Sequence, residues 1–264
     1  MVSFFTKYGE LLVAEELAVS QWASNQLGGH AVCGLLARQL ETHCPTGFIP
    51  TRMTVDLFRP VANKPLRVHS EVVRRGSRMT VADASIVQNE QIRVRATTVF
   101  LTTGVVPPGQ VWKPAPVLPM PPRGCVSPDG SPPLFKSGDR EWSRDFVTNQ
   151  NADRKIFWHS LPPLIEGEPL TPFQRAAFLG DTTNLVCHWG SCGAGYINTD
   201  MTLTLARLPL GYELGLRADS TIAANGISIG TATLYDRDSA VGTCVVTSLS
   251  NPLRQIDFAT VFGP

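Results

Sequence analysis

An internal repeat is the sequence feature that most constrains the fold of this chain. Residues 53–60 recur as residues 201–208 at a constant shift of 148 residues, and the register continues without a gap for about fifty residues. Identical pairs in this register include Met53 and Met201, Thr54 and Thr202, Arg59 and Arg207, Ala84 and Ala232, and Leu101 and Leu249. Two copies of one strand-rich unit predict two similar half-structures that bury a face against each other, and a site is expected where they meet.

Composition narrows the class of protein. With 264 residues, 43% of them hydrophobic and 17% charged, the chain can bury a core as one large domain or two small ones. The net charge of +1 gives no basic face for nucleic acid or for an acidic membrane surface. The first residues lack the pattern of a secretion signal, and no stretch approaches the roughly 20 apolar residues of a membrane span. We therefore expect a cytoplasmic protein.

The six cysteines form no regular framework. In a chain without a signal, this pattern favours free thiols in a reducing compartment. Cys187, His188 and Cys192 come close to a metal-binding spacing, but a second ligand pair is missing, so we expect no metal. The adjacent Cys187 and His188 also make a poor nucleophile and base, because neighbouring side chains seldom point together.

No G-x-S-x-G motif marks a serine hydrolase, and no cofactor is expected.

The first unit, residues 1–104, shows strand signals around one helix. Residues 11–19 predict a strand or strand pair, and apolar residues at helical spacing predict a helix over 30–43 that ends before Pro45. Strands are expected at 53–58, 66–74, 79–88 and 92–102, with a turn at Asn89 and Glu90.

A proline-rich linker, residues 105–140, precedes the second unit, residues 141–264. Ten prolines between positions 105 and 133 remove donors that a sheet would need. The second unit repeats the order: strands at 142–147 and 155–161, then a helix with Thr171 as N-cap and Pro172 at its first position, continuing toward Leu185. Strands are expected at 196–206, 213–222, 227–235 and 242–248.

In the order and spacing of its segments, the chain resembles the acyl-CoA thioesterase-like proteins of the double hotdog fold from about residue 10 to residue 251. The segments that carry the resemblance are residues 28–30, 54–60, 172–177, 197–202 and 234–238, together with Asp181 and Asn184. The resemblance implies an α+β fold in which two antiparallel sheets, each wrapped around a long helix, join edge to edge in one chain. It also implies an acyl-CoA or acyl-carrier thioester as substrate, and it allows a homodimer.

The resemblance places the catalytic function on Asp200, Thr221 and a third position. In the family an aspartate, a threonine and a glutamine hold and activate a water. Asp200 has Arg52 as its counterpart in the first unit, so the two halves differ there, as a single active site would require. The glutamine position falls on Thr247, a shorter side chain with no amide. Read structurally, all three are ordinary residues of strands and strand ends.

Substrate-binding residues are expected at the starts and ends of the helices. Gly28, Gly29 and His30 open the first helix, where free backbone amides suit an oxyanion. They could equally form a turn and a packed helix start. Asp181 and Asn184 lie three apart on the second helix, on one face, and are expected to point toward the seam or to satisfy a loop.

Three functions follow from these residues. The first is hydrolysis of an acyl-CoA thioester by water held near Asp200, Thr221 and Thr247. The second is a non-hydrolytic acyl-thioester binding protein, which the missing glutamine favours. The third is hydration of an enoyl thioester, for which the sequence shows no hydratase segment.

Overall fold

The computed structural model describes residues 2–21, 23–113 and 117–263. The first half contains β1 (Phe5–Tyr8), β2 (Leu11–Ala14), η1 (Glu16–Ala18), α1 (Gly29–Glu41), β3 (Phe48–Leu57), β4 (Val68–Arg74), β5 (Met79–Gln88) and β6 (Gln91–Thr102). The second half begins with β7 (Leu134–Ser137), α2 (Phe146–Asn149), β8 (Lys155–Ser160), α3 (Pro172–Asp181), α4 (Thr183–His188), β9 (Trp189–Gly190) and β10 (Gly193–Ala194). It continues with β11 (Tyr196–Asn198), β12 (Asp200–Leu205), β13 (Glu213–Ala224), β14 (Ile227–Tyr235), β15 (Ala240–Ser250), η2 (Pro252–Arg254) and α5 (Phe258–Phe262).

The repeated segments are themselves sheet partners, in β3 and β12. Thr54 lies directly opposite its repeat equivalent Thr202, and Val55 lies opposite Met201. A local two-fold axis therefore passes through the Thr54–Thr202 pair. The pairing is antiparallel and joins both halves into one sheet of eleven strands in the described part of the chain, in the order β4-β5-β6-β3-β12-β15-β14-β13-β8-β7, with β11 beside β15. The two expected sheets do meet edge to edge, and the pairing of β3 with β12 makes them one continuous sheet.

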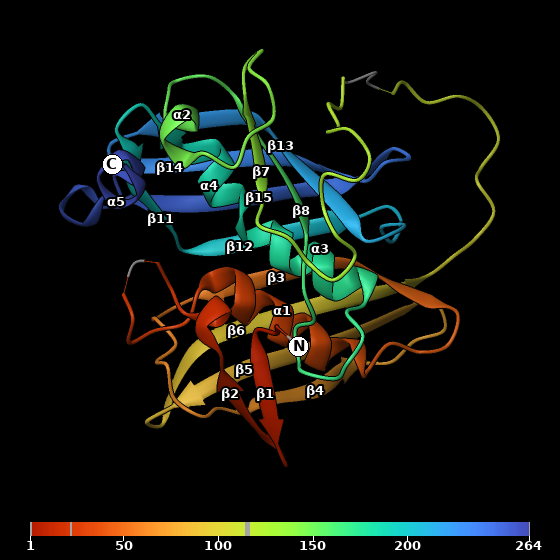
Figure 1. The fold of residues 1–264 in the computed structure, drawn as a ribbon. Coiled ribbons are helices and arrows are strands. Elements are labelled where there is room, and N and C mark those ends of the chain that lie inside the picture. The colour runs from red at the N-terminus through yellow and green to blue at the C-terminus, as the bar shows by residue number, and fades with distance from the viewer. Residues whose placement is uncertain (1, 22, 114–116, 264) are drawn as a thin grey trace.

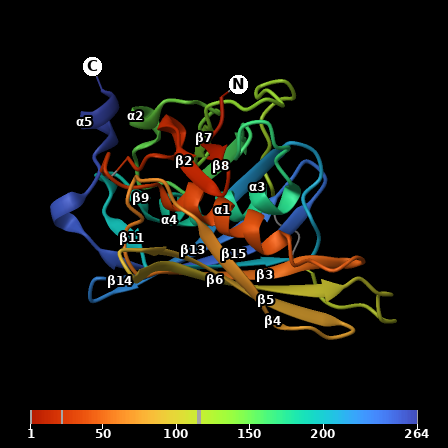
Figure 2. The ribbon, with the colours of Figure 1, turned by 90° about the horizontal axis from the view of Figure 1, so that it is seen from below.

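The main helices cover one face of this sheet. Figure 2 shows α1 and α3 side by side above the sheet, and Figure 1 shows them at the level of the seam. They run antiparallel, because the Glu41 carboxylate at the end of α1 accepts hydrogen bonds from Thr171 and Gln174 at the start of α3. The expected apolar stripe of α1 is confirmed, since Ala31, Val32, Leu35, Leu36 and Leu40 are all buried. The expected cap of α3 is confirmed too, because the Thr171 hydroxyl accepts from the Gln174 amide.

Several local predictions were wrong in the irregular segments. Residues 16–18 form a 3₁₀ turn instead of continuing a strand, and residues 146–149 form the short helix α2 where a strand was expected. The carboxylate of Asp145 caps α2 by accepting from the Val147 amide, which explains the helical turn. The second helix was expected to continue toward Leu185 but is divided at Thr182 into α3 and α4. The strand β7 falls inside the expected linker range.

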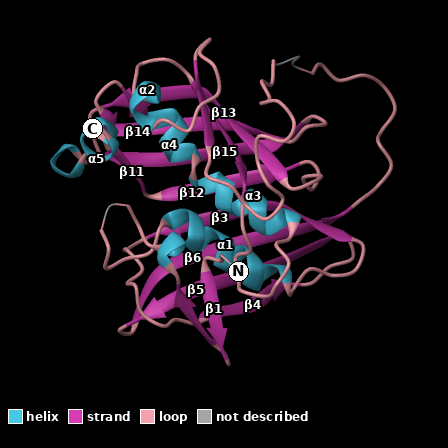
Figure 3. Cartoon of the chain, viewed as in Figure 1, coloured by secondary structure: helices cyan, strands magenta, loops and turns pink. Residues whose placement is uncertain are grey.

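Outside β7, most of the described residues between β6 and α2 have no regular structure, and Figure 3 shows them as a long loop beside the sheet. Pro114 and Pro116 lie outside the described residues. The prolines account for this loop, because they cannot donate to a sheet ladder. No helix of the described residues has the length and apolar character that a membrane span requires.

Candidate functional site

The start of α1 meets the end of α3 in a cluster of polar residues. A Cβ atom on Gly29 would lie 2.7 Å from Oδ2 of Asp181, and one on Gly28 would lie 2.5 Å from Cε1 of His30. A side chain at either position would have to displace the side chain that it meets, while the backbone angles of both glycines are ordinary. The Asp181 carboxylate also accepts a hydrogen bond of 2.8 Å from Asn198, at the end of β11. Four predicted binding residues, Gly28, Gly29, His30 and Asp181, therefore lie together, and Asn198, which was not predicted, contacts Asp181.

The surroundings of this cluster shift the pKa of its acid and of its base. Burial lowers the pKa of His30, while the nearby Asp181 carboxylate opposes the shift. Burial raises the pKa of Asp181, and His30 and the Asn198 amide oppose that shift. The His30 ring packs against Phe178, with 4.7 Å between ring centroids. His30 and Asp181 are each partly buried as residues.

Asn184 belongs to a separate hydrogen-bond network on α4. Its amide donates to the Tyr196 carbonyl, and its Oδ1 accepts from the Ser248 hydroxyl at 2.9 Å. His188 pairs with Asn184 through Nδ1 and with Ser228 through Nε2. Both ring nitrogens of His188 are therefore engaged, and burial lowers its pKa to about 4. Asn184 therefore holds α4 to the sheet and belongs to a network separate from the Asp181 cluster.

Asp200 and Thr247 are brought together at an irregularity in the sheet. Asn198 pairs with Ser248 and Thr202 pairs with Val245, so β11 and β12 carry one more residue than β15 between these pairs. This is a β-bulge. Oδ1 of Asp200 accepts a hydrogen bond of 3.0 Å from the Thr247 amide, in the place of a ladder carbonyl.

The bulge also sets the direction of Asp200. This residue lies opposite Asp56 of β3, whose neighbour Val55 is buried with the core. Directly opposed residues of antiparallel strands share a face, so Asp200 and Asp56 lie on the face away from α1 and α3. Asp56 is held by Arg95, with 2.8 Å between Nη2 and Oδ2. The second oxygen of Asp200 has a long contact of 3.3 Å from the Thr199 hydroxyl.

Thr221 lies apart from the other two. It belongs to β13, which β14 and β15 separate from β12. Neighbouring strands lie about 4.8 Å apart, so the backbones of Thr221 and Asp200 are separated by roughly 14 Å. The Thr221 hydroxyl donates to the Cys187 carbonyl at 3.0 Å, on the side of α4. The structure therefore joins Asp200 with Thr247, and joins Gly28, Gly29, His30 and Asp181, while Thr221 and Asn184 have other partners.

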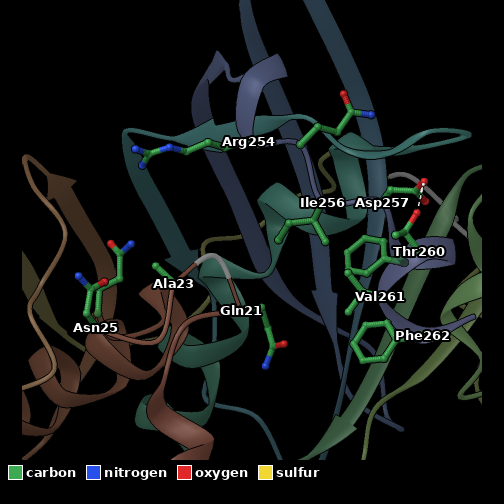
Figure 4. Close-up of a pocket in the computed structure, with 12 residues that line it drawn as sticks. Gln21, Ala23, Asn25, Arg254, Ile256, Asp257, Thr260, Val261 and Phe262 are labelled. Atoms are coloured by element: carbon green, nitrogen blue, oxygen red, sulfur yellow. Dashed lines mark hydrogen bonds between the residues drawn. The ribbon is translucent and has the colours of Figure 1, made fainter.

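A groove is lined by residues from both halves of the chain, and Figure 4 shows its lining. Its volume is about 690 Å³, and it lies between Gln21 and residues 23–26 on one side and the C-terminal residues 254–262 on the other. None of the sequence predictions included these residues. The loop residues that line the groove are polar or small, and the C-terminal segment follows the last repeated strand, so neither carries a repeat signal.

Together, the seam and its clusters define a protein of two related α+β units with a polar site between helix ends and sheet. A family model described as "Acyl-CoA thioesterase N-terminal domain" matches residues 18–101. A second, described as "Acyl-CoA thioesterase C-terminal domain", matches residues 121–249. The chain therefore belongs to the acyl-CoA thioesterase family, and its class is that of the thioester hydrolases. Among curated proteins, none matches the chain significantly.

Solved structures share the fold. The tesB protein of Mycobacterium avium subspecies paratuberculosis is 14% identical, with a TM-score of 0.66 over 94% of this chain and 96% of that one. An acyl-CoA thioesterase II from Mycobacterium marinum is also 14% identical, with a TM-score of 0.62 over 89% and 96%. A protein with hot dog fold from Alicyclobacillus acidocaldarius is 14% identical, with a TM-score of 0.67 over 94% and 95%. At this identity the likeness concerns the fold.

Proposed function

We propose that this chain, as a double hotdog with its acyl site at the seam, hydrolyses acyl-CoA thioesters by direct attack of water. The observation that carries the proposal is the match of both halves to acyl-CoA thioesterase domains. The polar clusters on the two sides of the seam support it. Hydrolysis needs a group that accepts the proton of water, donors for the oxyanion and a place for the acyl chain.

Asp200 is the proposed base. A carboxylate has about four lone-pair sites, and Asp200 uses one for the Thr247 amide and one for the long Thr199 contact. The remaining sites can hold a water, and because Asp200 lies on the face of the sheet away from α1, the proposal requires its side chain to turn toward the start of α1 when substrate binds. In the proposed step, water forms a bond to the thioester carbonyl carbon as its proton passes to Asp200. Collapse of the tetrahedral intermediate then breaks the C–S bond, and the thiolate leaves.

Two threonines complete the proposed set. Thr247 contributes the amide that fixes Asp200, and its hydroxyl stands where the family has glutamine. Thr221 is included in the catalytic set because its position matches that of the family threonine. In this conformation its hydroxyl donates to the Cys187 carbonyl. Thr221→Val is therefore expected to slow hydrolysis less than a change at Asp200.

The start of α1 is the proposed oxyanion site. Gly28 is the N-cap and has no side-chain cap, so the amides of the first turn have no side-chain acceptor there. Gly28 and Gly29 place no side chain over this backbone, and His30 and Asp181, which pack beside it, are proposed to bind substrate. Asn184 supports this region through β11. Loss of a single oxyanion donor typically slows acyl transfer by roughly 10²- to 10³-fold.

Separate substitutions of the two carboxylates test these roles. Asp200→Asn keeps the shape of the side chain and removes the base, so release of free thiol from acyl-CoA is expected to fall by at least about 10²-fold. Asp181→Asn is expected to raise KM more than it lowers kcat, because Asp181 is assigned to binding. If kcat falls in Asp181→Asn and not in Asp200→Asn, the base is Asp181 and not Asp200.

The second candidate is an acyl-thioester binding protein without hydrolysis. Thr247 favours it, because a threonine hydroxyl cannot span the distance that a glutamine amide spans. An increase in unfolding temperature with acyl-CoA, without any release of thiol, would distinguish this function from the enzyme.

A further inference from the structure

The hairpin of β4 and β5 concentrates positive charge on the first half of the chain. Arg74, Arg75 and Arg78 are exposed there, and none of them makes an ion pair within the described residues. Residues 72–82 contain no acidic side chain. In the 148-residue register, the equivalent positions of the second half carry no charge. The repeated fold therefore does not require these arginines, and the net charge of +1 conceals them.

The segment that follows β6, residues 103–113, carries exposed apolar side chains. These are Val105 (99% exposed), Val106 (84%), Val111 (82%) and Trp112 (85%). The segment ends in Lys113 and has no acidic residue. Apolar side chains gathered on a surface in this way mark a site of interaction.

The basic hairpin and the apolar segment meet at one end of the first half. Met79 lies opposite Leu101 in the pairing of β5 with β6, and the Thr102 amide donates to the Arg78 carbonyl at 3.2 Å. The apolar segment therefore starts beside the basic turn. Figure 1 shows it as a long arc that leaves β6 and runs outside the packed elements.

We propose that this surface, residues 73–78 and 103–113, binds a membrane that contains anionic lipids. The arginines attract anionic headgroups, and the valines and Trp112 can enter the membrane interface, where tryptophan is favoured. Pro107 and Pro108 suit that environment, because they have no backbone N–H to leave unpaired. A nucleic acid would match the arginines alone, whereas a lipid surface matches both the charge and the apolar segment.

A bound membrane would leave the candidate site free. Thr102 pairs with Phe48 at the start of β3, and the Phe48 amide donates to the Pro45 carbonyl, shortly beyond the end of α1. The lipid-binding surface therefore lies where α1 ends, while the contact between Gly29 and Asp181 lies where α1 begins. A helix of 13 residues is about 20 Å long, which separates the two regions.

Co-sedimentation of the full chain with vesicles tests the proposal. We would compare phosphatidylcholine vesicles with vesicles of an equal mixture of phosphatidylcholine and phosphatidylglycerol. The parent is expected to bind the mixture at least about 10-fold more tightly, and to lose this preference as the salt concentration rises. Arg74→Gln combined with Arg75→Gln is expected to weaken binding to the mixture by at least about 10-fold. Trp112→Ser is expected to weaken binding to both compositions and to remove the shift in tryptophan emission that vesicles cause in the parent.

Exposed residues of the second half of the chain supply matched controls. Arg123→Gln combined with Arg254→Gln removes the same charge, because both arginines are exposed and neither makes an ion pair with a described residue. Leu253→Ser removes an apolar side chain that is 98% exposed. Both controls are expected to bind vesicles as the parent does.

Two results would overturn the proposal outright. One is that the parent does not bind the mixed vesicles, and the other is that the double variant at Arg74 and Arg75 binds them as well as the control at Arg123 and Arg254. Binding of a duplex oligonucleotide that depends on Arg74 and Arg75, without binding to vesicles, would assign the surface to nucleic acid instead of lipid. Thiol release from acyl-CoA without vesicles is expected to be equal in all these variants, so lipid binding and hydrolysis are tested separately.

Discussion

Gly29 and Asp181 meet so closely that a side chain at residue 29 would have to displace the Asp181 carboxylate. A Cβ there would lie 2.7 Å and 2.8 Å from the two carboxylate oxygens of Asp181. This contact links the start of α1, in the first half of the chain, to the end of α3, in the second. The place of the polar cluster is thus fixed by helix packing across the seam.

Gly29→Ala is predicted to destabilise the chain. Alanine favours a helix over glycine by about 1 kcal/mol, but forcing a carbon against the carboxylate costs typically 1–3 kcal/mol. The steric cost is expected to exceed the helix gain, because the carboxylate lies between packed helices. Urea unfolding of the purified variant would measure the change in the free energy of unfolding.

Gly104→Ala is the matched control, since a Cβ at Gly104 would meet nothing within 4 Å. It is expected to leave stability nearly unchanged. In an Asp181→Ala background, the cost of Gly29→Ala is expected to shrink, because the opposing oxygens are gone. Equal costs in both backgrounds would contradict the proposed contact.

The ion pair between buried Asp236 and half-buried Arg207 is predicted to make stability depend on acid pH. Burial would raise the pKa of Asp236, but Arg207 and the amides of Leu210, Ser239 and Asp238 outweigh burial and lower the pKa to about 2. A pKa below the unfolded value means that the stabilisation is complete above about pH 4 and is lost as the pH falls toward 2. Asp236→Asn is expected to cost about 3 kcal/mol at neutral pH.

Unfolding free energies of the parent and of Asp236→Asn, measured between pH 2 and pH 6, would test this pair. The difference between them is expected to shrink as the pH falls. Asp238→Asn is the control, because Asp238 is exposed and makes only a 4.0 Å contact with Arg207, worth at most about 1 kcal/mol. A difference that is constant with pH would show that Asp236 does not titrate as described.

The six cysteines are all free in the structure and differ in exposure. Cys192 is exposed, while burial raises the pKa of Cys187 and of Cys244 to about 12. Because the thiolate is the reactive form, a thiol reagent at pH 8 is expected to label Cys192 much faster than these two. Rapid labelling of a Cys192→Ser variant at Cys244 would contradict the packing of α3 on β15.

The repeat predicted the seam better than any local pattern. Thr54 and Thr202, equated by the 148-residue shift, lie directly opposite each other, because a duplicated unit pairs with its copy about a two-fold axis. The helix over 30–43 was predicted within two residues of α1, since its apolar stripe is buried as the periodicity requires. Irregular segments were harder, because a single cap such as Asp145 can turn a short apolar run into a helix.

The candidate site could be predicted only in part. The polar cluster followed from Gly28, Gly29, His30 and Asp181, but its Asn198 contact depends on packing between α3 and β11. The direction of Asp200 depends on a β-bulge, for which the sequence has no signal. Thr221 was matched by its position in a strand, and strand position alone does not give the partner of its hydroxyl.

The most direct measurement is release of free thiol from acyl-CoA substrates of short to long chain, by the parent and by Asp200→Asn. The account predicts that the parent hydrolyses at least one acyl-CoA, and that Asp200→Asn keeps the unfolding temperature and coenzyme A binding of the parent but loses at least about 10²-fold in kcat. Equal turnover of every substrate by the folded Asp200→Asn variant would contradict the role of this carboxylate.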